Sequence, residues 1–256
     1  MPDPPAIHPS AIIDPSATIG PGATIGPMTV VMRGAAVGAG CRIGAHVVIH
    51  PDSRIGDAAR IDDLTVIGKL PMKAALSAVT REQPDLPGAV IGDECLLGAH
   101  VVVYRGASIG PRVMLADQVS VREEVAIGEK TIIGRGVAVE NRVRIGARCK
   151  IETGAYVTAL SEIGDGCFVA PMATFTNDNF MGRTKERFRH HKGVTLKDGA
   201  RIGANATMLP GLVVGEDGVV AAGSVVTNDV PPRKIVLGTP ARVWRDVPED
   251  QLLENQ

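Results

Sequence analysis

The chain has 256 residues and a formal net charge of −1, because 27 Lys and Arg residues face 28 Asp and Glu residues. This balance, without any long basic run, argues against a protein that binds nucleic acid through bulk electrostatics. No apolar stretch reaches the roughly 18 to 20 residues of a membrane-spanning helix, and the first residues are neither basic nor followed by a hydrophobic segment. We therefore expect a cytoplasmic protein with neither nucleic-acid nor membrane partners.

The composition of the hydrophobic residues is uneven. They make up 45% of the chain, yet the aromatic residues are only one Trp, two Tyr and four Phe. The core must therefore be filled by Ile, Val, Leu and Ala, which favours a repetitive interior.

An apolar residue recurs at every sixth position through most of the chain. The blocks run from Ile7 to Ile67, from Ile91 to Phe175 and from Leu196 to Val226. A period of six is not that of a helix, but it accommodates three pairs of inward and outward residues in an extended chain. Gly commonly follows the apolar residue, where a tight corner needs no side chain. Each hexad therefore predicts a short strand and a corner, and three hexads predict one 18-residue coil.

These repeats, as in ATIGPGATIGPM and GARIGANATM, resemble the hexapeptide-repeat proteins that fold as left-handed parallel β-helices. The resemblance covers about residues 7–226 and alone implies the handedness, because parallel crossovers are generally right-handed. We expect an all-β, left-handed parallel β-helix, a triangular prism, over residues 1–226, with inserted loops at about 69–90 and 176–195. Residues 227–256 should form a cap that ends in a short helix over about 248–255.

The four cysteines all occupy the small inward position of the repeat, two residues before an apolar residue. The chain contains no CxxC metal signature. Core packing is therefore expected for Cys41, Cys95, Cys149 and Cys167, rather than a disulfide, a zinc site or a nucleophile.

The first interruption of the repeat, from Lys69 to about Ala89, has the length for a short helix around Met72 to Val79. Two interpretations are open. The segment is either a surface excursion that covers part of the prism or a neighbour, or a source of basic side chains for an anionic ligand in a neighbouring subunit's cleft, namely Lys69, Lys73 and Arg81.

The second interruption, TNDNFMGRTKERFRHHKGVT, is rich in positive charge and holds several of the scarce aromatic residues. Five fixed cations against Asp178 and Glu186 favour a phosphate-bearing ligand, and the alternative is a solvated basic loop. Aromatic rings here favour apolar contacts, such as those to a nucleobase. The substrate-binding candidates are Arg183, Lys185, Arg189, His190 and Phe180.

Residues 18 positions apart should stack on one edge of the prism, because the phase is unbroken from Ile91 to Phe175. The column of residues that ends at the second interruption is mostly polar. It predicts one wall of a groove, in which residues of successive coils are about 5 Å apart. Asn141 and Asn177 are its catalytic candidates. The full column reads Arg105, Glu123, Asn141, Ala159 and Asn177.

Residues 173–242 resemble the nucleotide-linked amino-sugar N-acetyltransferases of the left-handed β-helix class. The matching features are Thr176 and Asn177 at the start of the loop, the DVPP segment from Asp229 to Pro232, and Gly238 to Arg242. The resemblance implies an acetyl-CoA donor, a UDP- or dTDP-linked amino-sugar acceptor and a homotrimer with active sites between subunits. It also implies that Asn177 orients the acceptor amine. The amino-terminal half of the chain is several coils longer than this pattern.

The implied reaction is attack of a neutral amine on a thioester, which a base with a pKa near 7 would assist. The candidate bases are Asp178, His190 and His100, while the resembled family can rely on positioning and on the substrate amine itself. For Asp178, a role in the loop turn is the alternative.

Acetyl-CoA should lie along the prism with its pantetheine hydrogen-bonded to backbone N–H groups, as of Ala204 and Ala222. The same amides are suited to stabilising a tetrahedral oxyanion. Lys234 or Arg242 should lie near the CoA phosphates. No resident metal is expected.

Other functions of this fold remain open, because the fold serves mainly acyltransferases but also carbonic anhydrases and structural subunits. The runner-up is an O-acetyltransferase acting on a sugar or serine hydroxyl, and a noncatalytic scaffold is a further candidate. A metal enzyme of the carbonic-anhydrase type would need three convergent imidazoles, which must come from His8, His46, His50, His100, His190 and His191.

Overall fold

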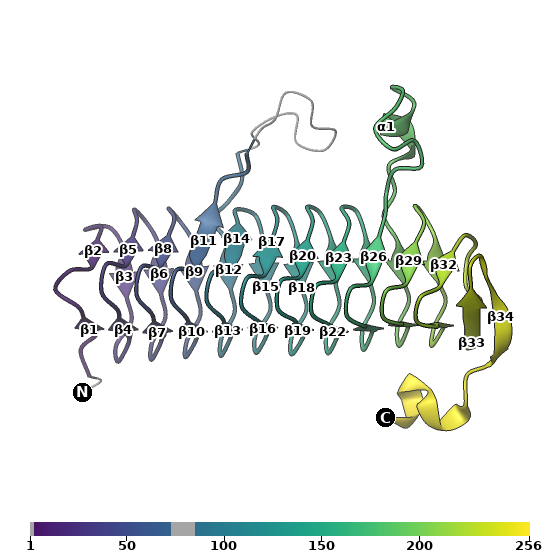
Figure 1. Ribbon diagram of the computed structural model, residues 1–256. Coiled ribbons are helices and arrows are strands. Elements are labelled where there is room, and N and C mark those ends of the chain that lie inside the picture. The colour runs from purple at the N-terminus through teal and green to yellow at the C-terminus, as the bar shows by residue number, and fades with distance from the viewer. Residues whose placement is uncertain (1–2, 73–84) are drawn as a thin grey trace. The chain divides into compact units, whose positions relative to one another are not determined.

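The computed structural model describes residues 3–72 and 85–256. The chain has the predicted all-β, left-handed parallel β-helix fold, in which most strands are two residues long. By its internal contacts the chain divides into two units, residues 1–130 and residues 131–256. Figure 1 shows the stacked coils within each unit, and each is described by itself below. Among the described residues, no helix combines the length and apolarity needed to cross a bilayer.

Within the first unit, three parallel sheets contain six strands each. The first sheet contains β1 (Ala6–Ile7), β4 (Thr24–Ile25), β7 (Arg42–Ile43), β10 (Arg60–Ile61), β13 (Leu96–Leu97) and β16 (Met114–Leu115). The second contains β2 (Ile12–Ile13), β5 (Val30–Val31), β8 (Val48–Ile49), β11 (Val66–Lys69), β14 (Val102–Tyr104) and β17 (Ser120–Val121). The third contains β3 (Thr18–Ile19), β6 (Ala36–Val37), β9 (Arg54–Ile55), β12 (Val90–Ile91), β15 (Ser108–Ile109) and β18 (Ala126–Ile127).

The second unit, taken by itself, also has three sheets of short strands and ends in a hairpin. Its first sheet contains β19 (Ile132–Ile133), β22 (Lys150–Ile151), β25 (Phe168–Val169), β28 (Arg201–Ile202), β31 (Val219–Val220), β33 (Lys234–Gly238) and the antiparallel β34 (Ala241–Asp246). The second contains β20 (Ala138–Val139), β23 (Tyr156–Val157), β26 (Thr174–Phe175), β29 (Thr207–Met208) and β32 (Val225–Val226). The third contains β21 (Arg144–Ile145), β24 (Glu162–Ile163), β27 (Thr195–Leu196) and β30 (Val213–Val214).

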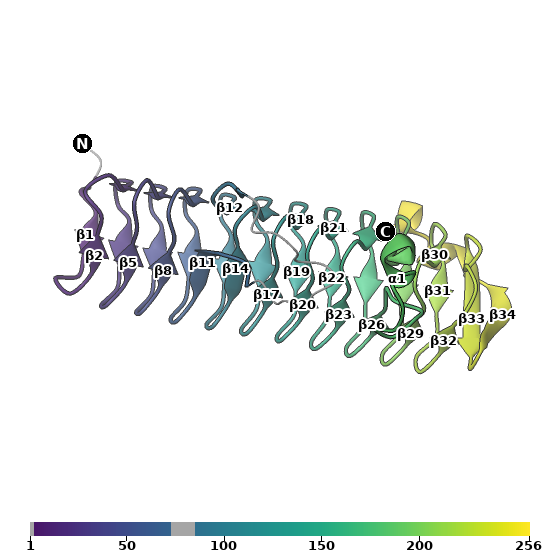
Figure 2. The ribbon, with the colours of Figure 1, turned by 90° about the horizontal axis from the view of Figure 1, so that it is seen from above.

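The pairing register is that of the six-residue repeat. Ile7 pairs with Ile25 and Val139 with Val157, so partners lie one coil apart. Figure 2 shows this stacking from above, for example through β20, β23, β26, β29 and β32. In each described strand from β4 to β32, the second residue is apolar and buried. This inward side chain explains why the six-residue phase of the sequence specifies the fold.

The small inward positions form hydrogen bonds between coils, as Thr131 illustrates. Its Oγ1 donates to the Gly146 carbonyl at 2.9 Å and accepts the Cys149 N–H at 3.0 Å. The Cys149 Sγ in turn donates to the Gly164 carbonyl at 3.0 Å. All four cysteines are buried and free, which confirms the predicted core role.

The described base of the first insertion is anchored by Arg105. Its Nε donates to the Leu86 carbonyl at 2.9 Å, and its Nη1 donates to the Pro51 carbonyl at 2.8 Å. Arg105 therefore holds the returning chain rather than lining an open groove wall. The predicted helix around Met72 to Val79 lies almost entirely outside the described residues, as do Lys73 and Arg81.

The carboxyl-terminal cap follows the last parallel coil. Strand β33 pairs with β31, β34 folds back on β33, and Ile235, Val247 and Leu252 form a small apolar cluster over Val219. The predicted short helix consists of two 3-10 turns, η1 (Glu249–Gln251) and η2 (Leu253–Asn255). The backbone of Leu252 between them is extended, which divides the expected helix in two.

Candidate functional site

The second insertion leaves the second unit directly after β26 and rejoins it at β27 (Figure 1). At its exit, Thr176 Oγ1 donates to the Met208 carbonyl at 2.8 Å. At its return, the Val194 N–H donates to Ser161 Oγ at 3.2 Å. Both ends are therefore tied to buried parts of neighbouring coils. The insertion carries one helix of a single turn, α1 (Arg187–His190).

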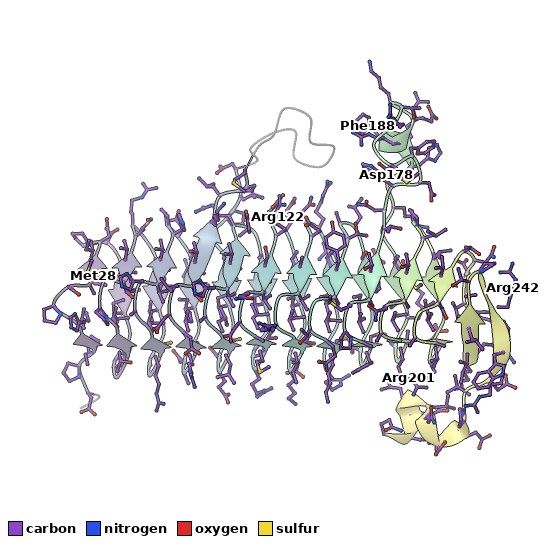
Figure 3. All side chains as sticks on the ribbon, viewed as in Figure 1. Met28, Arg122, Asp178, Phe188, Arg201 and Arg242 are labelled. Atoms are coloured by element: carbon purple, nitrogen blue, oxygen red, sulfur yellow. The ribbon has the colours of Figure 1, made fainter. Side chains whose placement is uncertain are left out.

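Asp178 organises the start of this loop. Its Oδ1 accepts the Phe180 N–H at 2.8 Å, and its Oδ2 accepts the Gly182 N–H at 2.9 Å. The guanidinium of Arg187 and the imidazole of His191 face the same Oδ2 at 3.5 and 3.9 Å. Figure 3 shows Asp178 in the loop, where the chain leaves the coils.

The surroundings of Asp178 lower the pKa of its carboxyl group. Burial by itself would raise that pKa, but the N–H groups of Gly182 and Phe180 and the positive charges of His191 and Arg187 outweigh it. A carboxylate that is stabilised in this way is a weak proton acceptor. The contacts favour the loop-turn role of Asp178 over a role as general base.

The predicted substrate-binding side chains lie on the exposed part of the loop. Arg183 and Lys185 are exposed, whereas Arg189 and His190 both face Glu186, at 3.6 Å. The Phe180 ring lies 5.8 Å from the His190 ring. The loop thus presents the predicted cations to solvent, with part of their charge offset by one carboxylate.

The sequence did not indicate Arg187 and His191 as site residues, although both are functional candidates in this loop. Their side chains are only 17% and 13% exposed, because both face Asp178. The guanidinium of Arg187 also lies 4.7 Å from the Phe188 ring. Spacing alone does not reveal this inward orientation, since the loop lacks the periodicity of the coils.

Asn141 and Asn177 lie on one edge of the second unit, as predicted. The pairing of β20 with β23 and of β23 with β26 puts both residues two positions past aligned strands, with Ala159 between them. Asn141 is only 3% exposed and its carbonyl accepts the Leu160 N–H at 3.3 Å. Asn177 is half-buried and opens the loop. Of this pair, Asn177 is therefore better placed to meet a ligand.

Several corner amides are capped by an aspartate of the next coil. Asp165 Oδ1 accepts the Ala147 N–H at 2.8 Å, for example, and Asp198 Oδ1 accepts the Asp165 N–H at 2.8 Å. At the corner of Ala204 the next coil carries Ala222 instead. Within residues 3–72 and 85–256, no group accepts a hydrogen bond from the N–H of Ala204 or of Ala222. Two successive corner amides thus remain available to a ligand.

These amides and the loop lie on different corners of the coil. Ala204 and Ala222 follow strands of the first sheet, β28 and β31, whereas the loop follows β26 of the second sheet. Strands of the second sheet, such as β29, separate the two corners. A single subunit therefore does not bring the predicted donor-binding amides and Asn177 together.

The two predicted phosphate-binding cations lie on the cap. Lys234 forms an ion pair with Asp246 across the β33–β34 hairpin, so that its charge is offset. Arg242 is exposed on β34 and donates from Nη1 to the Ala241 carbonyl at 2.8 Å (Figure 3). Of the two, Arg242 is the better suited to an anionic ligand.

The remaining candidate base, His100, belongs to the first unit. It lies exposed on a corner with a φ of 58°, and its N–H donates to the Asp63 carbonyl at 3.1 Å. In the same unit, burial and the charges of Arg105 and Lys69 lower the pKa of His50. Among the described residues, no three His, Cys, Asp or Glu side chains come together in a way that could hold a metal ion.

Two family models match the chain. The model described as bacterial transferase hexapeptide (six repeats) matches residues 16–51. The model described as hexapeptide repeat of succinyl-transferase matches residues 88–116, 119–159 and 193–228. Most of the first insertion falls within the unmatched residues 52–87, and most of the second falls within residues 160–192. The matches therefore follow the coils and leave out the two loops.

A curated relative, the 2,3,4,5-tetrahydropyridine-2,6-dicarboxylate N-acetyltransferase of Staphylococcus aureus (strain JH9), is 48% identical over 58 residues. The match spans 23% of this chain and 24% of the relative, so the chain aligns with about a quarter of that protein's length.

Solved structures of acyltransferases have the same fold. A UDP-N-acetylglucosamine acyltransferase from Bacteroides fragilis 9343 is 21% identical with a TM-score of 0.53, over 93% of this chain and 73% of that chain. The Arabidopsis UDP-N-acetylglucosamine acyltransferase is 22% identical with a TM-score of 0.51, over 97% and 76%. At these identities the likeness shows the fold alone.

Proposed function

The chain belongs to the hexapeptide-repeat acyltransferases, and on that premise we propose that it transfers an acetyl group from acetyl-CoA to the amine of a UDP- or dTDP-linked amino sugar. The observation that carries this proposal is the loop neck, residues 176–178 and 191–194 at the two ends of the second insertion. There Asn177 opens a segment rich in cations, and hydrogen bonds of Thr176 and Asp178 fix the chain on either side of it. We further propose a cytoplasmic location.

The donor half of the proposal rests on the free amides of Ala204 and Ala222. Successive coils are about 4.8 Å apart, so the two N–H groups form a short row along the prism. Pantetheine contains amide carbonyls that accept hydrogen bonds at such a row, and Arg242 is available for a phosphate. The same type of fixed N–H group would stabilise the oxyanion that forms when an amine attacks the thioester.

The acceptor half rests on the loop. A nucleoside diphosphate carries negative charge, which the exposed Arg183 and Lys185 suit. Phe180 offers an aromatic surface near them, and Asn177 at the neck supplies an amide that can orient the sugar amine. We assign the acceptor by this chemistry, and the resemblance of residues 173–242 to amino-sugar N-acetyltransferases supports it.

We propose a homotrimer in which neighbouring subunits complete each other's sites. The separation of the amide corner from the loop corner within one subunit supports this arrangement. A neighbour's loop could then meet the amides of Ala204 and Ala222, because closed rotational symmetry repeats one heterologous contact around the ring.

The test is a thiol-release assay with acetyl-CoA and a panel of UDP- and dTDP-linked 2-, 3- and 4-amino sugars, with hydroxyl-bearing analogues as controls. We expect turnover with one amine and none with its hydroxyl analogue. No turnover with any amine, together with no binding of CoA in calorimetry, would refute the proposed function.

O-acetyl transfer to a sugar or serine hydroxyl is the second candidate. A hydroxyl needs a stronger base than an amine does, and the half-buried His191 at the loop neck is the observation that favours it. Turnover of the hydroxyl analogues without turnover of the amines would select this candidate.

A further inference from the structure

His191 lies where the second insertion rejoins the coils. Two residues later, Gly193 packs so closely on the backbone of Leu160 and Ser161 that a Cβ there would lie 2.3 Å from the Ser161 N atom. The chain at His191 is therefore held against the coil. Asn177 lies at the other end of the loop, one residue past Thr176, so both residues belong to the loop neck.

The imidazole of His191 is oriented by a carboxylate and an aromatic ring. Its Nε2 is buried, lies 3.9 Å from Asp178 Oδ2 and has no hydrogen-bond partner among the described residues. The Phe188 ring stands edge-on at 6.0 Å. Asp178 itself is held by the two backbone N–H groups of Phe180 and Gly182. The ring thus faces a carboxylate whose position does not depend on His191.

A carboxylate on one ring nitrogen sets the role of the other. When Nε2 carries the proton toward Asp178, Nδ1 presents its lone pair. Nδ1 is not among the buried side-chain atoms that lack a hydrogen-bond partner, and it forms no hydrogen bond within the described residues, so it keeps some exposure to solvent. Among the described residues, the charged groups paired at this imidazole are Asp178 and, across the same carboxylate, Arg187.

We propose that His191 is the general base of the acyl transfer and that Asp178 is its positioning residue, an inference that rests on the proposed function. Nδ1 takes a proton from the acceptor nitrogen while that nitrogen forms a bond to the acetyl carbon. The carbon–sulfur bond of the thioester then breaks, and the proton held by His191 passes to the sulfur of CoA. The step needs no further reactant.

The test uses the full chain with the acceptor that the panel assay identifies. For His191→Asn we expect kcat to fall by about 10²-fold or more, the usual contribution of a positioned base. The affinity for CoA in calorimetry should stay within about threefold, because His191 does not lie on the amide corner. The rise of kcat with pH that reflects the base should be absent in the variant.

His46→Asn is the matched control. His46 is exposed on a corner of the first unit with a φ of 55°, a conformation that Asn also adopts readily. Its rate and pH profile should equal those of the wild type. A second variant, His191→Ala, should regain part of its kcat when free imidazole is added, which a purely structural role would not produce.

Two results would overturn the assignment. One is a wild-type enzyme that turns over while His191→Asn keeps its kcat within about threefold and its pH profile. The other is loss of rate in both His191 variants without any response to imidazole and with an unchanged pH profile. Failure of the wild type with every acceptor refutes the proposed function instead, so the two failures are distinguishable.

Discussion

Asp178 links the two ends of the second insertion at the scale of a single residue. Its oxygens hold the Phe180 and Gly182 amides, and the side chains of Arg187 and His191 face the same group. One carboxylate thus shapes the turn after Asn177 and orients a histidine that lies thirteen residues later in the sequence. The proposed acceptor site depends on these contacts.

The lowered pKa of Asp178 predicts how this turn responds to pH. A carboxyl whose pKa is depressed in the folded state contributes stability above its unfolded pKa, near 3.8, and loses it as the pH falls through the lower folded value. Hydrogen exchange of residues 176–194, corrected for intrinsic rates, should therefore be slower in the wild type than in Asp178→Asn throughout pH 4.5 to 7. The difference should vanish at lower pH. A difference that stays constant down to pH 2.5 would contradict this explanation.

Asn177→Ala tests the other residue at the loop neck. We expect turnover to fall by about 10²-fold, because misplacing the acceptor amine costs the rate gained by orientation. The oligomeric state, measured by light scattering after size exclusion, should be unchanged, since Asn177 belongs to a loop rather than to the buried core. Unchanged turnover would remove Asn177 from the mechanism.

At the scale of the element, the coil register continues on both sides of the second insertion. Phe175 pairs with Met208 across it, and Ile163 pairs with Leu196. In an uninterrupted coil, the inward positions that Phe175 and Val194 occupy would be four positions apart in the sequence. The loop increases this separation to nineteen. Function and scaffold are therefore separable in this part of the chain.

Deleting residues 178–192 should restore the four-residue spacing and leave an ordinary corner of Thr176, Asn177 and Gly193. We expect the circular dichroism spectrum and the melting temperature to change little, because the paired strands are untouched. Acetyl transfer should be lost and CoA binding retained. A variant that fails to fold would show that the loop is needed for the coils, against this expectation.

The capping pattern of the corners predicts a sharp test of the donor site. Ala222→Asp should cap the Ala204 N–H as Asp165 caps the Ala147 N–H, so that the fold gains a hydrogen bond while the proposed row of amides is blocked. We expect the Kd for CoA to rise by at least about tenfold, from the lost hydrogen bond and the added negative charge. The melting temperature should not fall. If calorimetry gives the same CoA affinity for this variant as for the wild type, the donor does not bind at this corner.

At the scale of the whole molecule, the proposed site needs two copies of the chain. The amides of Ala204 and Ala222 and the loop neck follow strands of different sheets, and each copy can offer one half to each neighbour. Shared sites of this kind allow complementation. When one chain carries a substitution at the amide corner and another chain carries one at the loop neck, some sites combine the two intact halves.

Co-expression of Asn177→Ala and Ala222→Asp chains tests this arrangement. If the two chains mix at random in a trimer, about one quarter of the sites receive an intact half from each partner. Activity at subsaturating acetyl-CoA should approach one quarter of the wild-type value, while each variant alone stays low. Activity that never exceeds that of the separate variants would place the site within one subunit.

The coils could be predicted from the sequence because each inward position is chosen by the same local requirement. An apolar residue at every sixth place, a small residue two places earlier and a flexible corner define the pairing without knowledge of distant contacts. The edge shared by Asn141 and Asn177 follows from the same count. The cap was predicted in outline, although its helix became two 3-10 turns.

What the sequence by itself determined is thus the β-helix, the position of its two insertions and the edge on which Asn177 lies. Only the tertiary structure decided which loop side chains turn inward, that Asp178 is hydrogen-bonded, that His191 faces it and that Lys234 is paired with Asp246. The physical reason is periodicity. Coil residues repeat one environment every six positions, whereas each loop residue finds its partners by packing and charge across distances that no spacing rule encodes.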